Sequence, residues 1–211
     1  MRRLRFRLCC LLLGAVLMTS SCGEPELPEP GLTGGWSTAG CEFARRPETV
    51  TVGHRVLPAT PAALEAAMAR IDAAGRAHHA ASYAGLEVDQ QRVRAIVYRV
   101  PSAAFDEFIR LTAENTCIVV RDAAHSLADL SDWHDRIVAD LPAWQANDVR
   151  ISSVVARHDG FGVEIGTPDV DRARIEMPRR YGREAPLVFV EEGPVRPLAE
   201  PGVPTAPQPG G

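Results

Sequence analysis

The chain contains no lysine, so arginine alone supplies its 23 basic residues, against 27 acidic residues. An acidic balance argues against nucleic acid as the partner, because phosphate binding requires clustered positive charge. It argues equally against electrostatic adhesion to anionic lipid. The sequence also lacks an apolar run of the about 20 residues that a membrane-spanning helix needs.

Residues 1–21 have the features of an export signal. Four arginines among the first seven residues form a charged region, the stretch from Leu8 to Met18 is apolar, and Ser20 and Ser21 are the small residues expected at a cleavage site. Removal of this signal leaves 19 basic and 27 acidic residues, a net charge of −8. The mature protein is therefore expected outside the cytoplasm.

The sequence Thr19-Ser20-Ser21-Cys22 resembles the bacterial lipobox, in which cleavage leaves a lipid-modified cysteine at the new N-terminus. Thr19 stands where an aliphatic residue is usual. The resemblance implies lipidation of Cys22 and anchoring to the bacterial cell membrane; the alternative is a secreted protein with an unpaired thiol at Cys22. The segment 22–47 is rich in Pro, Gly and Glu, which is typical of a tether.

Two cysteines remain in the mature chain apart from Cys22. Cys9 and Cys10 lie in the signal, which leaves Cys41 and Cys117. An even pair in an exported protein favours a disulfide between them. Two separately buried thiols are the alternative.

Two segments share one plan of strand, turn, strand, helix and strand. The first is expected to form strands at Tyr83 to Val88, Val93 to Val100 and Cys117 to Val120, with a helix capped by Ser102. The second is expected to form strands at Ile151 to Ala156, Phe161 to Ile165 and Leu187 to Val190, with a helix capped by Thr167. The repeat predicts an α+β fold of two ββαβ units with small three-stranded antiparallel or mixed sheets.

A long amphipathic helix is predicted to join the two units. Ser126 caps it, apolar side chains recur at spacings of three and four as far as Trp144, and Pro142 is expected to kink it or end its regular part. Short strands and a helix after Thr60 precede the first unit. The predicted divisions are a first α/β unit at 48–122, the linking helix at 123–148, the second unit at 149–192 and a disordered Pro/Gly tail at 193–211.

Candidate catalytic and metal-binding residues are scattered. The six histidines lack metal-ligand spacing: His54, His78, His79, His125, His134 and His158. Asp129, Asp132 and Asp135 recur on the linking helix, where they form either a solvated acidic face or, if buried, an acid–base or cation site. Ser126 lies near His125 and Asp129, but no nucleophile elbow surrounds it. The sequence therefore predicts no catalytic residue, no cofactor and no metal.

Loose hydrophobic motifs in both units carry a resemblance to a known family. They are Tyr83-Ala84-Gly85-Leu86-Glu87-Val88-Asp89 with the following strand, the stretch from Val119-Val120-Arg121 to His125-Ser126-Leu127-Ala128-Asp129-Leu130, and the second hairpin. Together these segments resemble the propeptide of secreted bacterial serine proteases of the alpha-lytic and streptogrisin type. The similarity covers roughly Ala63 to Leu198.

The resemblance implies two small α/β units that template the folding of an adjoining protease and inhibit it with their C-terminal sheet and tail. In such a precursor the protease would begin near the point where this chain ends. The chain departs from the pattern because no protease sequence is linked to it. The leading hypothesis is thus a non-catalytic lipoprotein that binds another exported protein. The resemblance favours a secreted serine protease, chaperoned or inhibited by the lipoprotein, as that partner. The alternative is an envelope lipoprotein that binds a small molecule between sheet and linking helix.

Overall fold

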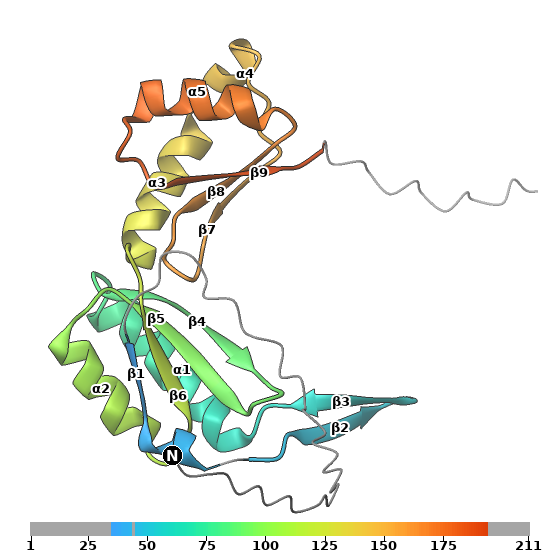
Figure 1. Ribbon diagram of the computed structural model, residues 1–211, viewed down its shortest axis with the longest axis vertical. Coiled ribbons are helices and arrows are strands. Elements are labelled where there is room, and N and C mark those ends of the chain that lie inside the picture. Colours follow the sequence, from blue (N-terminus) through green and yellow to red (C-terminus); the bar gives the residue numbers. More distant parts are fainter. Residues whose placement is uncertain (1–34, 44, 194–211) are drawn as a thin grey trace, which may run out of the picture.

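The computed structural model describes residues 35–43 and 45–193, which form two ββαβ units in an α+β fold (Figure 1). The elements of the N-terminal part are β1 (Gly35–Ser37), the 3₁₀ helix η1 (Ala39–Glu42), β2 (Glu48–Val52), β3 (Arg55–Ala59), α1 (Ala62–His78), β4 (Tyr83–Asp89), β5 (Arg94–Arg99), α2 (Ala103–Ala113) and β6 (Ile118–Asp122). The elements of the C-terminal part are α3 (Leu127–Ala139), α4 (Leu141–Ala146), β7 (Ser153–Ala156), β8 (Val163–Thr167), α5 (Val170–Tyr181) and β9 (Leu187–Glu191).

The predicted repeat is present as one strand topology used twice. In the first unit β4 pairs antiparallel with β5, and β5 pairs parallel with β6 across the helix α2. In the second unit β7 pairs antiparallel with β8, and β8 pairs parallel with β9 across α5. The hairpin and the helical crossover place the second strand of each unit in the centre of its three strands.

The first sheet has four strands, one more than predicted, because β1 pairs antiparallel with β6. The tether predicted at 22–47 is therefore too long, since residues 35–42 belong to the first unit. Three residues with the sequence Gly-Trp-Ser are too few to show the alternation that marks a strand. Trp36 packs against the first core, where the Arg110 guanidinium lies 4.4 Å from the centre of its ring.

The helices α1 and α2 cover one face of the first sheet, with Leu64, Ile71, Phe105 and Ile109 buried against it. Ser102 caps α2 as predicted, because its hydroxyl accepts a hydrogen bond from the Phe105 N–H at 3.4 Å. Arg99 is buried at the end of β5, where it donates to Asp106 at 2.7 Å and also to Asp122. These carboxylates compensate the desolvation of the buried guanidinium.

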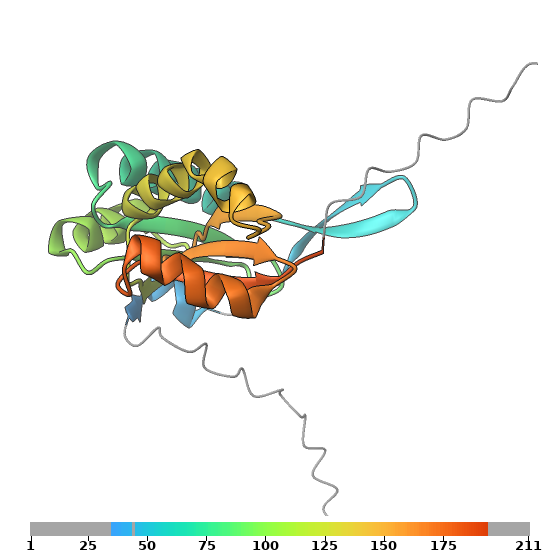
Figure 2. The ribbon, with the colours of Figure 1, turned by 90° about the horizontal axis from the view of Figure 1, so that it is seen from above.

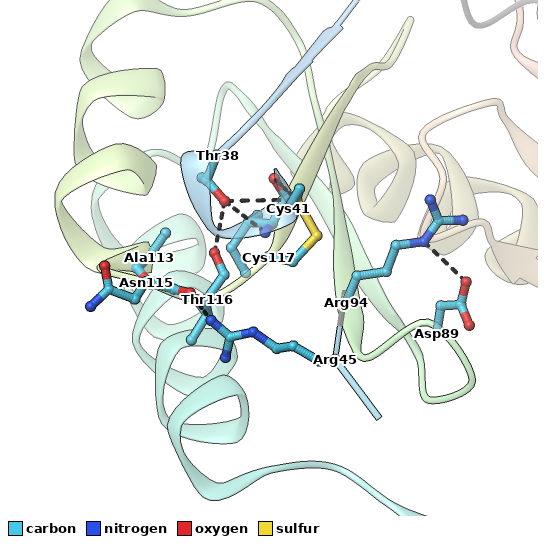
Figure 3. The surroundings of a disulfide bond; sticks show 10 residues. Thr38, Cys41, Arg45, Asp89, Arg94, Ala113, Asn115, Thr116 and Cys117 are labelled. Atoms are coloured by element: carbon cyan, nitrogen blue, oxygen red, sulfur yellow. Dashed lines mark hydrogen bonds and ion pairs between the residues drawn. A yellow bond between two sulfur atoms is a disulfide. The ribbon is translucent and has the colours of Figure 1, made fainter. Parts of the chain in front are cut away.

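A disulfide joins Cys41 of η1 to Cys117, the pair named from the sequence, and ties β1 and η1 to the first unit (Figure 3). The neighbouring Thr38 reinforces this attachment. Its hydroxyl donates to the Thr116 carbonyl at 2.7 Å and accepts from the Ile118 N–H at 2.9 Å. The N-terminal segment is thus held by covalent and polar contacts beside a short strand.

The predicted linking helix is two helices, α3 and α4, which meet at Asp140. Pro142 explains the break, because proline lacks an N–H and its ring clashes with the preceding turn of a helix. Ser126 caps α3 as predicted, accepting from the Asp129 N–H at 3.1 Å. The break lets α4 turn toward α5, as Figure 1 shows.

The cap predicted for the helix α5 is wrong by two residues. Asp169 caps it, accepting from the Arg172 N–H at 3.1 Å, whereas Thr167 is still part of β8 and pairs with Glu191. The Thr167 hydroxyl instead donates to the Arg150 carbonyl at 2.6 Å. Pairing with β9, which is distant in sequence, keeps Thr167 extended and moves the helix start.

The strands β2 and β3 form a two-stranded hairpin that projects away from the body of the protein (Figures 1 and 2). Every residue of β2 is exposed, and large apolar side chains are among them. Cross-strand partners share one face of a hairpin, so Val50, Val52 and Leu57 lie together on one side.

The two units touch where the β7–β8 turn meets one end of the first sheet. The His125 N–H donates to the Gly160 carbonyl at 3.1 Å. Gly85 of β4 lies so close to His158 that an added Cβ would stand 2.2 Å from its carbonyl oxygen. His158 also approaches Glu87 across the joint, with 3.4 Å between Nε2 and Oε2. Close backbone packing thus fixes the contact.

Candidate protein-binding surface on the second unit

The second sheet has strand order β7-β8-β9, and α3, α4 and α5 pack on one of its faces. Fully buried side chains fill the space between the sheet and these helices, among them Leu130 and Ile137 of α3 and Val163 and Ile165 of β8. The alternative hypothesis placed a small-molecule pocket between the sheet and the linking helix. The apolar packing occupies that interval, so the observation does not favour a ligand site there.

The opposite face of the second sheet, the outer face, is lined by Val155, Glu164, Val188 and Val190. Their position follows from the register, since Val155 pairs with Glu164 and Glu164 pairs with Val188, out of phase with the buried positions. Val155 is 47% exposed. Glu164 is bound by Arg157 at 3.0 Å. The outer face therefore combines an apolar strip with the charge-compensated Glu164 and with Glu192, whose carboxylate binds the Ser153 hydroxyl.

The strand β9 is an edge of this sheet, because among the described strands only β8 pairs with it. The Val163 N–H donates to the Pro186 carbonyl, and the Glu192 N–H donates to the Thr167 carbonyl, so the backbone groups of even-numbered residues face β8. Those of odd-numbered residues, Phe189 and Glu191 among them, face away from it. A row of donors and acceptors at a sheet edge is a template for another strand.

A chain of hydrogen bonds holds α5 behind this sheet. The Trp144 indole N–H donates to the Tyr181 hydroxyl at 2.8 Å, and that hydroxyl donates to Asp140 at 2.9 Å. Arg180 donates to both oxygens of Asp140, at 2.6 and 2.8 Å. Arg180 and Tyr181 lower the pKa of Asp140, whereas burial raises the pKa of Tyr181. These hydrogen bonds connect α5 to the junction of α3 and α4.

The turn between β7 and β8 is held by a second ionic group. The Arg157 guanidinium binds both Asp159 and Glu164. Burial raises the pKa of Asp159, but hydrogen bonds from Arg157 and from the Phe161 N–H outweigh it, so this pKa lies below its ordinary value. Asp159 raises the pKa of Arg157. These pairs fix the turn that contacts the first unit.

The structure separates most of the candidate catalytic residues. Ser126 is fully buried, and its hydroxyl donates to Asp129 at 2.8 Å while it caps α3. His125, Asp129 and Asp132 do meet in a surface groove of about 320 Å³. His134 instead bonds its neighbour Asp135 at 2.9 Å. The buried serine hydroxyl is committed to the helix cap.

The remaining histidines occupy structural or surface positions. His79 stacks on Phe105 with ring centres 4.8 Å apart. His54 belongs to the turn of the β2–β3 hairpin. Across residues 35–43 and 45–193, no group of three or more His, Cys, Asp or Glu residues is arranged to hold a metal ion. In the same part of the chain, no helix has the length and apolar character needed to cross a membrane.

Sequence reasoning did not identify the features that define this surface. The lipidation site Cys22 lies outside the described residues and stays a prediction. The segment from Leu187 to Val190 signals an unprotected edge, since it contains neither charge nor proline. That signal has meaning only once the strand order is known.

Comparisons of this chain with protein-family models, curated proteins and solved structures find no match.

Proposed function

We propose that this chain is a non-catalytic exported lipoprotein that binds another exported protein by pairing a strand of that protein with the free edge of β9. A secreted serine protease, chaperoned or inhibited by this contact, is the class of partner that the resemblance to protease propeptides favours. The lipobox-like sequence at Cys22 supports anchoring at the outer side of the cell membrane.

One observation carries the proposal. The two units share a topology, and β6 and β9 are the same strand of the repeat. In the first unit the outer edge of β6 is occupied by β1, an antiparallel strand from outside the repeat. In the second unit no described strand occupies the corresponding edge. The first unit is thus an internal precedent for a strand, antiparallel to β9, that a partner supplies.

The chemistry of β9 suits strand addition. A partner strand would pair with the backbone groups of Phe189 and Glu191, and each hydrogen bond contributes about 0.5 to 1.5 kcal/mol net. Val188 and Val190, on the outer face of β9 itself, offer apolar area beside the new strand. Backbone pairing supplies affinity, and the adjoining side chains supply selectivity.

The test is binding of the mature lipoprotein to secreted serine proteases of the same organism, together with inhibition of each protease. We expect Glu191→Pro to weaken binding at least tenfold, because proline removes an outward N–H from the edge. Val190 and Glu192, whose backbone groups face β8, are left unchanged. Glu191→Ala, which keeps the N–H, is the matched control and is expected to bind normally.

Two results separate the parts of the proposal. Equal affinity of folded Glu191→Pro and Glu191→Ala variants for a bound partner would show that the β9 edge is not the contact. Absence of binding and inhibition with every protease tested would remove the protease class. Folding of each variant is checked by thermal unfolding before binding is measured.

A further inference from the structure

The β2–β3 hairpin, here called the arm, is exposed on both faces (Figures 1 and 2). Large aliphatic side chains lie on each face, with Val50, Val52 and Leu57 on one and Val56 on the other. None of them belongs to a hydrophobic cluster formed by residues 35–43 and 45–193. An isolated two-stranded hairpin is marginally stable at best in water, whereas three or more strands with an apolar face are stable. The arm therefore gains stability from a further strand that pairs with it.

Contacts on both sides fix the base of the arm. On the side of β2, the Arg45 guanidinium donates to the Asn115 carbonyl, close to the disulfide (Figure 3). On the side of β3, the Gln90 side-chain amide donates to the Thr60 hydroxyl at 3.3 Å. The arm is thus held at a defined place on the first unit while its two strands project from it.

The pairing within the arm determines which backbone groups point outward. The two-residue turn 53–54 joins Val52 to its partner Arg55, and such a turn is closed by a hydrogen-bonded pair. Hydrogen-bonded and non-hydrogen-bonded pairs alternate along an antiparallel ladder. The N–H and carbonyl groups of Thr49 and Thr51 therefore point away from β3.

The two edges of the arm differ in their capacity to accept another strand. On β3 the outward groups belong to Val56 and Pro58, and Pro58 has no N–H, so this edge is interrupted. On β2 both Thr49 and Thr51 keep donor and acceptor, and among the described strands only β3 pairs with β2. The free edge of β2 is therefore the one that another strand can extend.

We propose that β2 pairs antiparallel with β2 of a second copy of this chain, which gives a four-stranded sheet of order β3-β2-β2-β3. A two-fold axis at Val50 places that residue opposite its own counterpart and places Thr49 opposite Thr51 of the second copy. This register uses all five residues of each strand and pairs every outward backbone group. A shift by two residues would bring Pro47 or Gly53 into the ladder instead. The edge of β2 is thus self-complementary, as a two-fold interface requires.

The side chains of the arm match in the same register. On one face Leu57 and Val50 of each copy form a continuous apolar row across the four strands, since Val50 and Leu57 pair within the arm. Glu48 stands in one cross-strand row with Arg55 of the second copy, so opposite charges and not like charges share a row. Neither residue has an ion-pair partner among the described residues. On the other face threonines pair across the new contact, which is a favourable combination.

The acidic charge of the chain does not prevent this contact. β2 contains one carboxylate and β3 one guanidinium, so the strands of the arm carry no net charge. Antiparallel pairing places the two folded bodies at opposite ends of the paired strands, about 17 Å apart for five residues. Because the Debye length is about 8 Å at physiological ionic strength, repulsion between the bodies is largely screened. The contact does not involve β9, so this inference does not rest on the proposed function.

Disulfide cross-linking of the mature chain tests the position of the axis. The proposed register places the Cβ atoms of the two Val50 residues about 4.5 Å apart, close to the separation in a disulfide. Val50→Cys, in a protein that also carries Cys22→Ser, should therefore form a covalent dimer under mild oxidation, seen by non-reducing electrophoresis.

Val52→Cys in the same background is the matched control. Val52 is more exposed than Val50, 61% against 48%, so exposure alone would make it the faster residue to cross-link. In the proposed register, however, Val52 lies about 14 Å from its counterpart. We expect cross-linking of Val50→Cys to be at least about tenfold faster. Equal or faster cross-linking of Val52→Cys would overturn the proposal.

Sedimentation equilibrium without cross-linking tests the dimer itself. The average mass of the mature protein should rise with concentration toward twice the monomer value. Thr49→Pro removes one outward N–H from each copy and leaves the bonds between β2 and β3, so it should weaken the dimer at least about tenfold. Thr49→Ala, which keeps the N–H, should remain close to the wild-type protein. Thermal unfolding checks that each variant is folded.

Three results would overturn the proposal. The first is a wild-type protein that stays monomeric at all concentrations up to about 1 mM, which is weaker than specific interfaces bind. The second is equal dimerisation of folded Thr49→Pro and Thr49→Ala variants. The third is a dimer in which Val50→Cys does not cross-link, which would place the contact at another edge such as that of β9.

Discussion

Removal of the disulfide between Cys41 and Cys117 should lower stability by an amount that follows from the length of the loop it closes. The two cysteines are 76 residues apart. In the chain-entropy model a closed loop of that length restricts the unfolded state by about 4.5 kcal/mol at 25 °C. For a protein of this size that corresponds to a decrease in Tm of about 9 to 18 °C.

The measurement is urea denaturation and thermal unfolding of the mature protein and of its Cys41→Ser, Cys117→Ser double variant. The loss should be accompanied by faster hydrogen exchange at β1, because among the described strands only β6 pairs with this three-residue strand. The Thr38 N–H, which donates to the Ile118 carbonyl at 3.0 Å, reports on the same attachment. A reductant should reproduce the effect in the wild-type protein and change nothing further in the double variant.

A small effect would refute the reasoning. If the double variant loses less than about 1 kcal/mol, the disulfide constrains the unfolded chain far less than the loop length requires. If exchange at β1 is also unchanged, Thr38 and the pairing with β6 hold the N-terminal segment without the bond. Mass spectrometry of the unreduced protein shows whether the two thiols are joined before either conclusion is drawn.

Four further predictions concern other parts of the chain. Tyr181→Phe leaves the buried Trp144 N–H without its acceptor and should cost about 1 to 3 kcal/mol of unfolding free energy in urea. The pKa of Asp159 lies below its ordinary 3.8, so the stability it contributes is present above that pH and is lost as pH falls below it; Asp159→Asn should flatten the decline of unfolding free energy measured between about pH 5 and pH 2. Gly85→Ala places a Cβ against the backbone of the second unit at a φ of 153° and should destabilise the joint by at least about 2 kcal/mol, seen as faster exchange at the His125 N–H. Acylation of Cys22 should appear as an added mass on the mature N-terminal peptide, and an unmodified cysteine would contradict anchoring.

Local signals predicted the fold well where the physical cause is itself local. Ser102 and Ser126 cap the helices that follow them, since a side chain and an N–H three residues later decide a cap. The duplicated order of strands and helix could also be predicted, because the spacing of apolar residues within each segment indicates a strand or a helix. Pro142 marked the point where the linking helix stops being regular, although the sequence left open whether the helix would kink or end.

Pairing between distant segments could not be predicted in the same way. β1 is a strand because β6 lies beside it, and nothing in Gly-Trp-Ser requires that. Thr167 looked like a cap because Pro168 follows it, but pairing with Glu191 extends β8 through it. The candidate surface depends on the same kind of information. Leu187 to Val190 was recognised as a strand, but its free edge is a property of the sheet and not of the segment.

The edge of β6 is occupied by β1, whereas no described strand occupies the outer edge of β9. This difference raises the question of how β9 could bind one partner strand selectively. An unprotected edge pairs with almost any strand, including that of a second copy, so backbone hydrogen bonds alone give affinity without choice. The net charge is −4 for the full chain and would be −8 after removal of the predicted signal, so it repels another copy and favours a basic partner. Glu191 and Glu192 place two carboxylates at the C-terminal end of β9. A partner strand that runs antiparallel to β9, as β1 runs to β6, would therefore begin with basic residues at that end.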